Sequence, residues 1–187
     1  PGTPVWVSYS PNPARKLPYT WQMAEADGTF VGMNTANPNP LVEAAIRSGT
    51  LTELQGYDQL RREVAYGKNS RIDILLEGPG SALTYVEVKN VHWKRGTTAA
   101  FPSSVTTRGA KHMGELAEMV RQGHQAYVVY VLQRNDCDGF ELAHDIDPHY
   151  GRETLKALES GVKALVYACD VSPDGIKISN SLTFNVA

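Results

Sequence analysis

The chain alternates short apolar runs with turn residues, and the period of its apolar positions changes along its length. In the first thirty-odd residues, short extended runs around Val5, Tyr19 and Phe30 are separated by turns rich in Pro, Asn and Gly. Such runs are typical of β-strands. Three strands this short cannot bury a core by themselves. We therefore expect this segment to pack on the rest of the chain or to belong to a larger β-domain.

A polar linker rich in Asn and Pro follows these strands. The last residues of this linker have the pattern of a helix start, with Asn39 as the expected N-cap and Pro40 in the first turn. Apolar residues then recur with helical spacing, and Glu43 projects from this short helix. We place a domain boundary here, between residues 1–37 and residues 38–187.

The second part alternates predicted strands and helices. Strands are predicted over residues 60–66, 71–77, 83–91, 126–132, 162–168, 175–178 and 182–186. Helices are predicted over residues 107–122 and 150–160, and a loop over residues 96–106. The run at 126–132 is almost continuously apolar, which is typical of a strand covered on both faces. The pattern predicts an α/β fold with a mixed central sheet flanked by helices.

Composition agrees with this fold class. The 187 residues are 42% hydrophobic and 20% charged, which excludes a disordered chain, a collagen and a coiled coil. No apolar run approaches the roughly 20 residues of a membrane span, and the start lacks the features of a signal peptide. We expect a cytoplasmic protein with no membrane partner. Cys137 and Cys169 have no Cys or His at ligand spacing and are expected to be inert.

The charge is unevenly distributed. The net charge is -2, yet residues 88–113 contain five Lys or Arg residues and no acidic residue, while both ends of the chain are acidic. A block of like charge is either a solvated face or a site for phosphate or another anion. The charge alone leaves both interpretations open.

A predicted hairpin adjoins this block. A turn centred on Gly80 places Asp73 opposite Glu87 and Arg71 opposite Lys89. The two-residue period of a strand puts Glu87 and Lys89 on one face. Two facing carboxylates repel each other by about 0.2–1 kcal/mol, so a positive charge is expected between them.

A hard divalent cation, Mg²⁺ or Mn²⁺, would satisfy this pair, because such ions take carboxylate, phosphate and water ligands. Asp73 and Glu87 are the candidate metal ligands, and they form the candidate catalytic set with Lys89 and Glu43. Lys89 would orient a water or stabilise charge on a phosphate. Glu63 is a less favoured alternative to Glu43.

An alternative needs no metal. In it, Lys89 neutralises Glu87 and Arg71 neutralises Asp73 in a solvated cross-strand network. The spacing alone does not separate the two interpretations.

The basic block supplies candidate contacts to nucleic acid. Lys94 and Arg95 follow the hairpin, and Arg108, Lys111 and His112 lie in the first turns of the next helix. Cations there oppose the helix dipole unless an anion binds at that end. His112 either contacts phosphate or caps the helix face.

No element of this chain is of a kind that reads base edges. Trp93 either stacks on a base or packs in the core. We therefore expect that any binding of nucleic acid is led by contacts to the phosphate backbone, weakly specific and sensitive to salt.

Beyond these deductions, the sequence resembles a known family. Asp73 followed by Glu87-Val88-Lys89, with Glu43 upstream, resembles the PD-(D/E)XK nuclease-like superfamily, although Ile72 stands in the place of its variable proline. Further motifs that carry the resemblance are Asn34-Thr35, Asn39-Pro40-Leu41-Val42, Tyr66-Gly67, Ser70-Arg71-Ile72-Asp73, Phe101-Pro102, Arg108-Gly109 and Ile146-Asp147. Together they resemble the sugar fermentation stimulation protein A family over essentially the whole chain.

The resemblance implies a nuclease-like α/β domain preceded by part of an OB-like β-domain. It also implies DNA binding and a regulatory role in sugar (maltose) metabolism, and it adds Arg15 and Lys16 to the candidate nucleic-acid contacts. Chains of the family normally begin well before Pro1, so part of the barrel is expected to lie outside this sequence. Ser103 stands where the family usually has Asp, which removes one metal or base contact.

Three functions remain open from the sequence. The first is a DNA-binding protein with an intact Mg²⁺-dependent nuclease site. The second is a non-catalytic DNA-binding regulator that retains the fold. The third is a module for a small anion or nucleotide, although no phosphate-binding Gly loop supports it. The oligomeric state also stays open, a homodimer included.

Overall fold

The computed structural model describes residues 2–185. Its strands are β1 (Val5–Tyr9), β2 (Tyr19–Ala26), β3 (Thr29–Gly32), β4 (Gln59–Tyr66), β5 (Ser70–Glu77), β6 (Leu83–Val91), β7 (Lys94–Arg95), β8 (Thr98–Phe101), β9 (Gln125–Leu132), β10 (Gly139–Leu142), β11 (Lys163–Ser172), β12 (Gly175–Ser181) and β13 (Thr183–Asn185). Its helices are α1 (Pro38–Arg47), α2 (Thr107–Arg121) and α3 (Pro148–Glu159), with a 3-10 turn, η1 (Thr52–Leu54). None of the helices described is long and apolar enough to cross a membrane.

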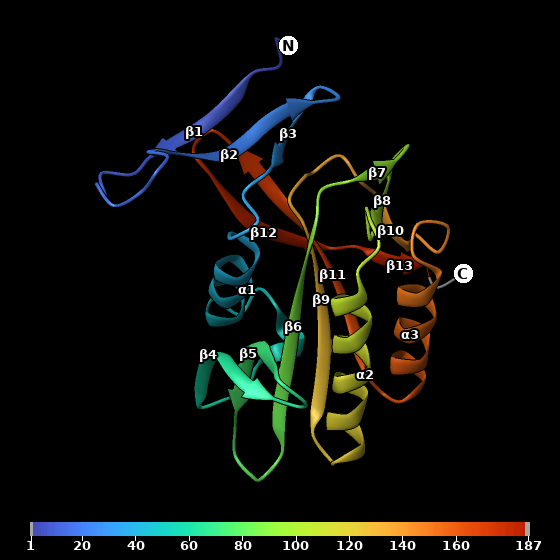
Figure 1. Cartoon of the computed structure of the whole chain (residues 1–187). Helices are drawn as coiled ribbons and strands as arrows, with labels where there is room; N and C mark the ends of the chain where they lie inside the picture. Colours follow the sequence, from blue (N-terminus) through green and yellow to red (C-terminus); the bar gives the residue numbers. More distant parts are fainter. Residues whose placement is uncertain (1, 186–187) are drawn as a thin grey trace.

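A six-stranded mixed sheet forms the centre, in the order β12-β11-β9-β6-β5-β4. The inner strands β6, β9 and β11 are parallel, whereas β4, β5 and β12 run antiparallel to their neighbours. Figure 1 shows α1 on one side of this sheet and α2 with α3 on the other. The predicted α/β fold with a mixed, helix-flanked sheet is confirmed.

Strand alternation divides the core into two clusters. Along β9, Val128 and Tyr130 face the cluster with α2 and α3, while Val129 and Val131 face the one with α1. Every residue of β9 from Ala126 to Leu132 is buried, as its apolar run predicts. The two-residue period also places Glu87 of β6 on the α2 side.

The N-terminal strands form a separate sheet in the order β1-β2-β3. Figure 1 shows it above one end of the central sheet. One side packs inward through Met23 and Val31, and Gly32 N donates to Gln133 O at 2.7 Å. The opposite side of β1 and β2 exposes large apolar side chains: Val5, Val7, Tyr9, Tyr19 and Trp21.

A small four-stranded sheet, β13-β10-β8-β7, corrects the predicted loop at residues 96–106. Within that loop, β8 pairs in parallel with β10, which comes about forty residues later. Short strands flanked by Gly96 and Pro102 give no strand pattern of their own, because their partners come from distant segments. The predicted final strand ends at Val186, which lies outside the described residues.

Two helices begin earlier than predicted. Asn37, not Asn39, is the N-cap of α1, because Pro38 and Pro40 both fit a first turn whose N–H groups have no helical partners. Helix α3 begins at Pro148 because the Asp147 carboxylate caps it, accepting from His149 N at 3.1 Å and Tyr150 N at 2.9 Å. The first correction frees the Asn39 side chain for another partner.

Candidate functional site

The hairpin of β5 and β6 opens at Asp73. The ladder has the predicted register from Glu77↔Leu83 to Ile74↔Val86 and goes no further. Instead, Asp73 Oδ2 accepts a hydrogen bond from Val88 N at 2.7 Å. The predicted pairing of Asp73 with Glu87 within the ladder is therefore wrong in detail, because the Asp73 side chain takes the place of a backbone partner.

Asn39 holds the other oxygen of this carboxylate. Its Nδ2 donates to Asp73 Oδ1 at 2.8 Å, which ties the first turn of α1 to β5. Sequence reasoning missed this role, because it assigned Asn39 to the N-cap. The sequence did contain a signal for it, because Asn37 can be the N-cap of α1 in place of Asn39.

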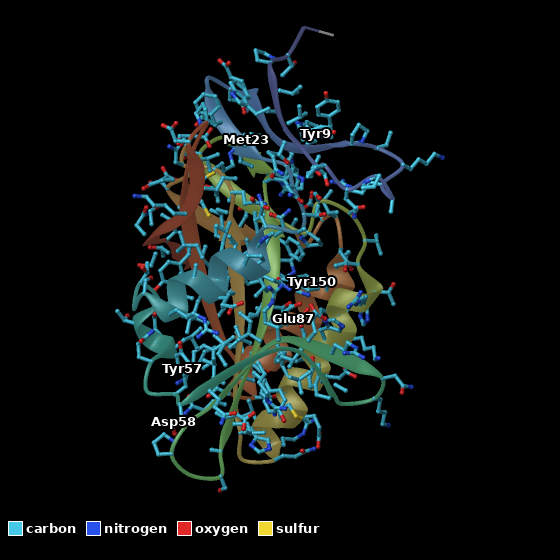
Figure 2. All side chains as sticks on the ribbon, turned by 90° about the vertical axis from the view of Figure 1, so that its left-hand side faces the viewer. Tyr9, Met23, Tyr57, Asp58, Glu87 and Tyr150 are labelled. Atoms are coloured by element: carbon cyan, nitrogen blue, oxygen red, sulfur yellow. The ribbon has the colours of Figure 1, made fainter. Side chains whose placement is uncertain are left out.

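Glu87 lies in the interior, 3% exposed, on the side of β6 that faces α2 (Figure 2). Its Oε1 accepts from Lys89 Nζ at 2.8 Å and contacts His112 Nδ1. Its Oε2 is buried and has no hydrogen-bond partner among residues 2–185. A carboxylate oxygen in that state is costly unless a further positive group approaches it.

His112 is a buried partner of Glu87. Arg108 Nε donates to His112 Nε2 at 3.3 Å, so Nε2 is the acceptor and Nδ1 carries the proton given to Glu87. Neither predicted role, a phosphate contact or a helix cap, describes this arrangement. His112 fixes the carboxylate from the α2 side, as Lys89 does along the strand.

The two carboxylates affect each other's protonation. Burial and the negative charge of Glu87 raise the pKa of Asp73, and the hydrogen bonds from Val88 and Asn39 offset this only in part. Burial also acts to raise the pKa of Glu87, but the hydrogen bond with His112 and the charge of Lys89 outweigh it and lower that pKa. The neighbouring positive charge thus stabilises the ionised form of Glu87 more than that of Asp73.

These groups open onto a cleft of about 280 Å³, here called the carboxylate cleft. Its lining residues are Thr35, Asn39, Asp73, Glu87, Val88, Lys89, Thr106, Arg108, Gly109 and His112. Helix α2 begins at its rim, where the Thr106 side chain accepts from Gly109 N at 3.1 Å. Asp147 Oδ2 accepts from Thr106 N at 2.8 Å, so the cap of α3 also fixes the start of α2.

The structure does not bring Glu43 into this cleft. Its carboxylate is 2.9 Å from Arg47 Nη2 and 3.7 Å from Arg62 Nη1. A helix-surface ion pair explains this residue, so its predicted catalytic role lacks support in the geometry. Glu63, the other candidate, lines a neighbouring cleft instead.

The metal-free network is only half present. Lys89 contacts Glu87 as that alternative requires, but Arg71 Nη1 donates to the backbone oxygen of Glu63 at 2.8 Å. The ladder ends before Arg71 and Lys89 would meet. Asp73 therefore has hydrogen-bond donors around it but no ion pair within the described part of the chain.

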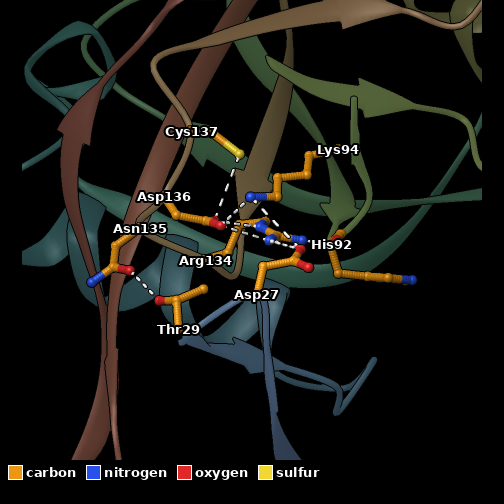
Figure 3. Close-up of polar contacts among 8 residues, drawn as sticks. All are labelled: Asp27, Thr29, His92, Lys94, Arg134, Asn135, Asp136 and Cys137. Atoms are coloured by element: carbon orange, nitrogen blue, oxygen red, sulfur yellow. Dashed lines mark hydrogen bonds and ion pairs between the residues drawn. The ribbon is translucent and has the colours of Figure 1, made fainter. Parts of the chain in front are cut away.

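Lys94 is neutralised by acidic residues from distant segments (Figure 3). Its Nζ is 2.5 Å from Asp136 Oδ2 and 3.7 Å from Asp27 Oδ2. Arg134, buried beside it, binds Asp136 through Nε at 2.5 Å and Asp27 through Nη2 at 3.3 Å. Asp27 belongs to the N-terminal sheet, so this cluster joins that sheet to the α/β part.

Arg95 is neutralised in the same way. It binds Asp145 at 2.7 Å and Glu141 at 3.3 Å, and its guanidinium lies 4.7 Å from the centroid of the half-buried Trp93 ring. The predicted roles of Lys94 and Arg95 as free phosphate contacts are thus not supported. Trp93 supports Arg95 rather than presenting an open stacking face.

The remaining basic candidates differ in position. Arg108 is exposed at the rim of the carboxylate cleft, and Lys111 lies one turn further along α2. Arg15 and Lys16 lie in the β1–β2 connection, where Arg15 Nη2 donates to Thr20 Oγ1 at 2.9 Å. Neither lines the carboxylate cleft, whereas Arg108 lines it and Lys111 lines the neighbouring cleft.

The donor set fits one hard cation held by two carboxylates. No group of three or more His, Cys, Asp or Glu side chains suited to a metal occurs in the described residues. Asp73 and Glu87 remain, and the partnerless Glu87 Oε2 is the observation that favours a cation there. Mg²⁺ commonly uses one or two protein carboxylates and completes its shell with water and phosphate.

The comparisons with known proteins agree with this architecture. A family model for the sugar fermentation stimulation protein RE domain matches residues 36–175, and one for the SfsA N-terminal OB domain matches residues 1–33. The sugar fermentation stimulation protein homolog of Rhodospirillum centenum is 58% identical over 97% of this chain and 78% of its own length. The homolog of Paramagnetospirillum magneticum is 51% identical over 100% of this chain and 79% of its own.

A solved structure matches the fold. It is that of Pyrococcus furiosus SfsA in complex with Ca²⁺, with a TM-score of 0.89 and 25% sequence identity. The match covers 99% of this chain and 79% of the other. Family models and close relatives thus agree over nearly the whole length, and the chain belongs to the sugar fermentation stimulation protein family.

Proposed function

We propose that this protein binds DNA by contacting the phosphate backbone of the DNA. It cleaves phosphodiester bonds with the help of a divalent cation, Mg²⁺ or Mn²⁺, held by Asp73 and Glu87. One observation carries the proposal. Glu87 Oε2 is a buried carboxylate oxygen without a described partner, beside a second carboxylate, at a cleft that also contains Lys89 and Arg108. A solvated surface network would not leave an anionic oxygen buried and unpaired.

Support for the cation comes from ligand chemistry. A family relative, the Pyrococcus furiosus protein, was solved in complex with Ca²⁺, which prefers oxygen ligands as Mg²⁺ does. When bound, such a cation supplies positive charge that polarises a phosphoryl oxygen. It would also relieve the repulsion from Glu87 that, after burial, raises the pKa of Asp73.

The side chains of the cleft have separate roles in this proposal. Lys89, only 11% exposed and 2.8 Å from Glu87, stabilises negative charge that develops on the phosphate. His112 is a positioning residue, since it holds Glu87 Oε1 and leaves Oε2 free. Arg108, at the rim, contacts the phosphate backbone of the substrate.

A second candidate is a non-catalytic DNA-binding regulator. The ligand count favours it, because Asp73 and Glu87 are the only carboxylates of residues 2–185 that line the cleft, and the exposed Ser103 stands near the start of α2 where the family usually has Asp. Under this alternative the cation and Arg108 serve binding alone.

Incubating the pure protein with plasmid and single-stranded DNA separates the two candidates. Cleavage with Mg²⁺ or Mn²⁺ that stops with chelator, and that Glu87→Gln and Lys89→Ala abolish, supports the proposal. Glu43→Gln is the matched control, because it removes a carboxylate outside the cleft. Cleavage unchanged in Glu87→Gln contradicts the catalytic assignment, and DNA binding without cleavage under every cation favours the regulator.

A further inference from the structure

We propose that a second cleft beside the carboxylate cleft binds one phosphate group of the nucleic acid, next to the phosphate that reacts. This inference rests on the proposed function and specifies how the substrate lies in the site. The second cleft, here called the basic cleft, measures about 300 Å³. It is lined by Arg71, Arg108 and Lys111, together with Glu63, Asn69 and Ser70.

The two clefts are continuous. Arg108 and His112 line both of them. Liquid water occupies about 30 Å³ per molecule, so the basic cleft has room for a phosphate group and its waters. A strand with its reacting phosphate at Asp73 and Glu87 would therefore place a neighbouring phosphate in the basic cleft.

Arg71 provides a preset donor there. Residues on either side of Glu63 in β4 pair in register with β5, yet Glu63 itself has a left-handed φ of 54°, which is uncommon for a residue other than glycine. Its carbonyl oxygen accepts from Arg71 Nη1 at 2.8 Å and orients the guanidinium. The other N–H groups of Arg71 pair with no carboxylate of residues 2–185, which leaves them available for phosphate.

Lys111 closes the far rim. Its Nζ donates to Lys68 O at 2.7 Å and to Ser70 Oγ at 3.0 Å, and lies 3.5 Å from Glu115 Oε1. These contacts hold the ammonium at the edge of the cleft. Glu115 thus offsets the charge of Lys111, and Arg71 and Arg108 supply the two cations of this cleft that pair with no carboxylate of residues 2–185.

The positive surface ends at Lys111. The next cleft along α2 is lined by Tyr66, Tyr85, Glu115 and Glu118 in addition to Lys68 and Lys111. Its two carboxylates balance the charges of the two lysines, so it offers no net positive charge to a phosphate backbone that continued in this direction. One phosphate, not an extended backbone, is thus the ligand of this side of the site.

Such a phosphate has two sources with the same chemistry. It is either an internal phosphodiester or the terminal phosphate of a strand end. The test uses a short single-stranded oligothymidylate, labelled at its 3′ end, with either a 5′-phosphate or a 5′-hydroxyl. Fluorescence anisotropy measures binding at several salt concentrations in chelator, where no cation-dependent cleavage takes place.

Arg71→Ala should weaken binding about tenfold and reduce the salt slope by about 1, and Arg71→Lys should recover part of the affinity. Arg152→Ala is the matched control, because it removes an exposed arginine from α3, outside both clefts. Loss confined to the 5′-phosphate oligonucleotide identifies a terminal phosphate, and equal loss for both identifies an internal one.

The results also separate this inference from the proposed function. If wild-type protein binds and cleaves but Arg71→Ala matches Arg152→Ala, the phosphate subsite is wrong and the proposed function stands. If the wild-type protein binds neither oligonucleotide in chelator, the phosphate subsite is overturned, and if it also binds neither in Ca²⁺, the proposed function is overturned with it.

Discussion

The acid-free stretch of residues 88–113 contains two basic regions, one at Lys94 and Arg95 and the other at Arg108, which differ in their ion pairs. In the first, Lys94 and Arg95 are neutralised by four carboxylates from distant segments. In the second, Arg108 faces a cleft, has His112 as its described hydrogen-bond partner, and forms no ion pair with any carboxylate of residues 2–185. The difference teaches that a basic run in a sequence shows where cations occur, but tertiary contacts decide which remain available to an anion.

The first region is structural because ion pairs hold its cations, Lys94 beside the buried Arg134 and Arg95 at the exposed surface. Arg134 has a side chain 5% exposed and joins Asp136 and Asp27 beside Lys94 (Figure 3). Beside the second region, Glu87 is equally buried, but one of its oxygens has no partner within residues 2–185. Burying a charge is unfavourable in both places. In the first region ion pairs compensate it, whereas at Glu87 one oxygen remains to be compensated by a ligand.

The largest expected effect comes from Asp73→Asn. The amide retains the shape of the carboxylate, and a rotated Asn39 amide preserves the hydrogen bond to it. Cleavage should fall by about a thousandfold, while the free energy of unfolding stays equal or rises, because a buried repulsion is removed. Cleavage assays and urea denaturation measure the two quantities, and a less stable Asp73→Asn protein would contradict this explanation of its raised pKa.

Removing the ion pairs of Arg134 beside Lys94 should lower the free energy of unfolding. Arg134→Ala removes a buried side chain and leaves the half-buried Asp136 with Lys94 alone, so we expect the free energy of unfolding to fall by about 1–3 kcal/mol. Arg108→Ala, on an exposed side chain, should change it by less than about 0.5 kcal/mol. Urea denaturation compares the pair, and equal losses would show that the two regions do not differ as described.

His112→Asn should weaken the binding of the cation. Removing a group that orients a ligand typically costs about 10–100-fold in metal affinity. His149→Asn, an exposed histidine on α3, is the control and should change nothing. Titration of Mn²⁺ measures both variants, and unaltered affinity in His112→Asn would remove its positioning role.

DNA affinity should distinguish the two regions directly. Arg108→Ala should weaken binding roughly tenfold for all sequences and lower the salt slope by about 1. Lys94→Ala should leave DNA affinity unchanged, because Asp136 and Asp27 already neutralise Lys94. Anisotropy at several salt concentrations measures both, and the reverse order would assign DNA binding to the first region.

The smallest effect concerns acid stability. The hydrogen bond from Arg134 lowers the pKa of Asp136 in the folded protein. Its contribution to stability is therefore complete above the unfolded pKa of about 3.9, and it is lost as pH falls below that value. Asp136→Asn should flatten this part of the stability curve against pH, while Asp170→Asn, an exposed control, should leave it unchanged.

Much of this site follows from sequence alone, and the rest depends on tertiary structure. The turn around Gly80 predicts the register of β5 and β6, and strand period predicts that Glu87 and Lys89 share a face. The opening of the ladder at Asp73 is not predictable in this way, because Asn39 from α1 and Val88 N stabilise it together.

The role of His112 was hidden for a related reason. Its spacing in α2 predicts only a side chain near the helix start, whereas contact with Glu87 requires α2 to pack across β6. The neutralisation of Arg95 likewise depends on Asp145, fifty positions later. Such contacts leave no periodic pattern in the local sequence.

The most direct test of the cation site is a calorimetric titration of Ca²⁺ into the protein and three variants. We predict one site in the wild-type protein and in Glu43→Gln, whose carboxylate pairs with Arg47 outside the cleft. We predict no measurable binding in Asp73→Asn and Glu87→Gln. Binding that persists in Glu87→Gln, or that disappears in Glu43→Gln, would contradict the assignment of the cation to the carboxylate cleft.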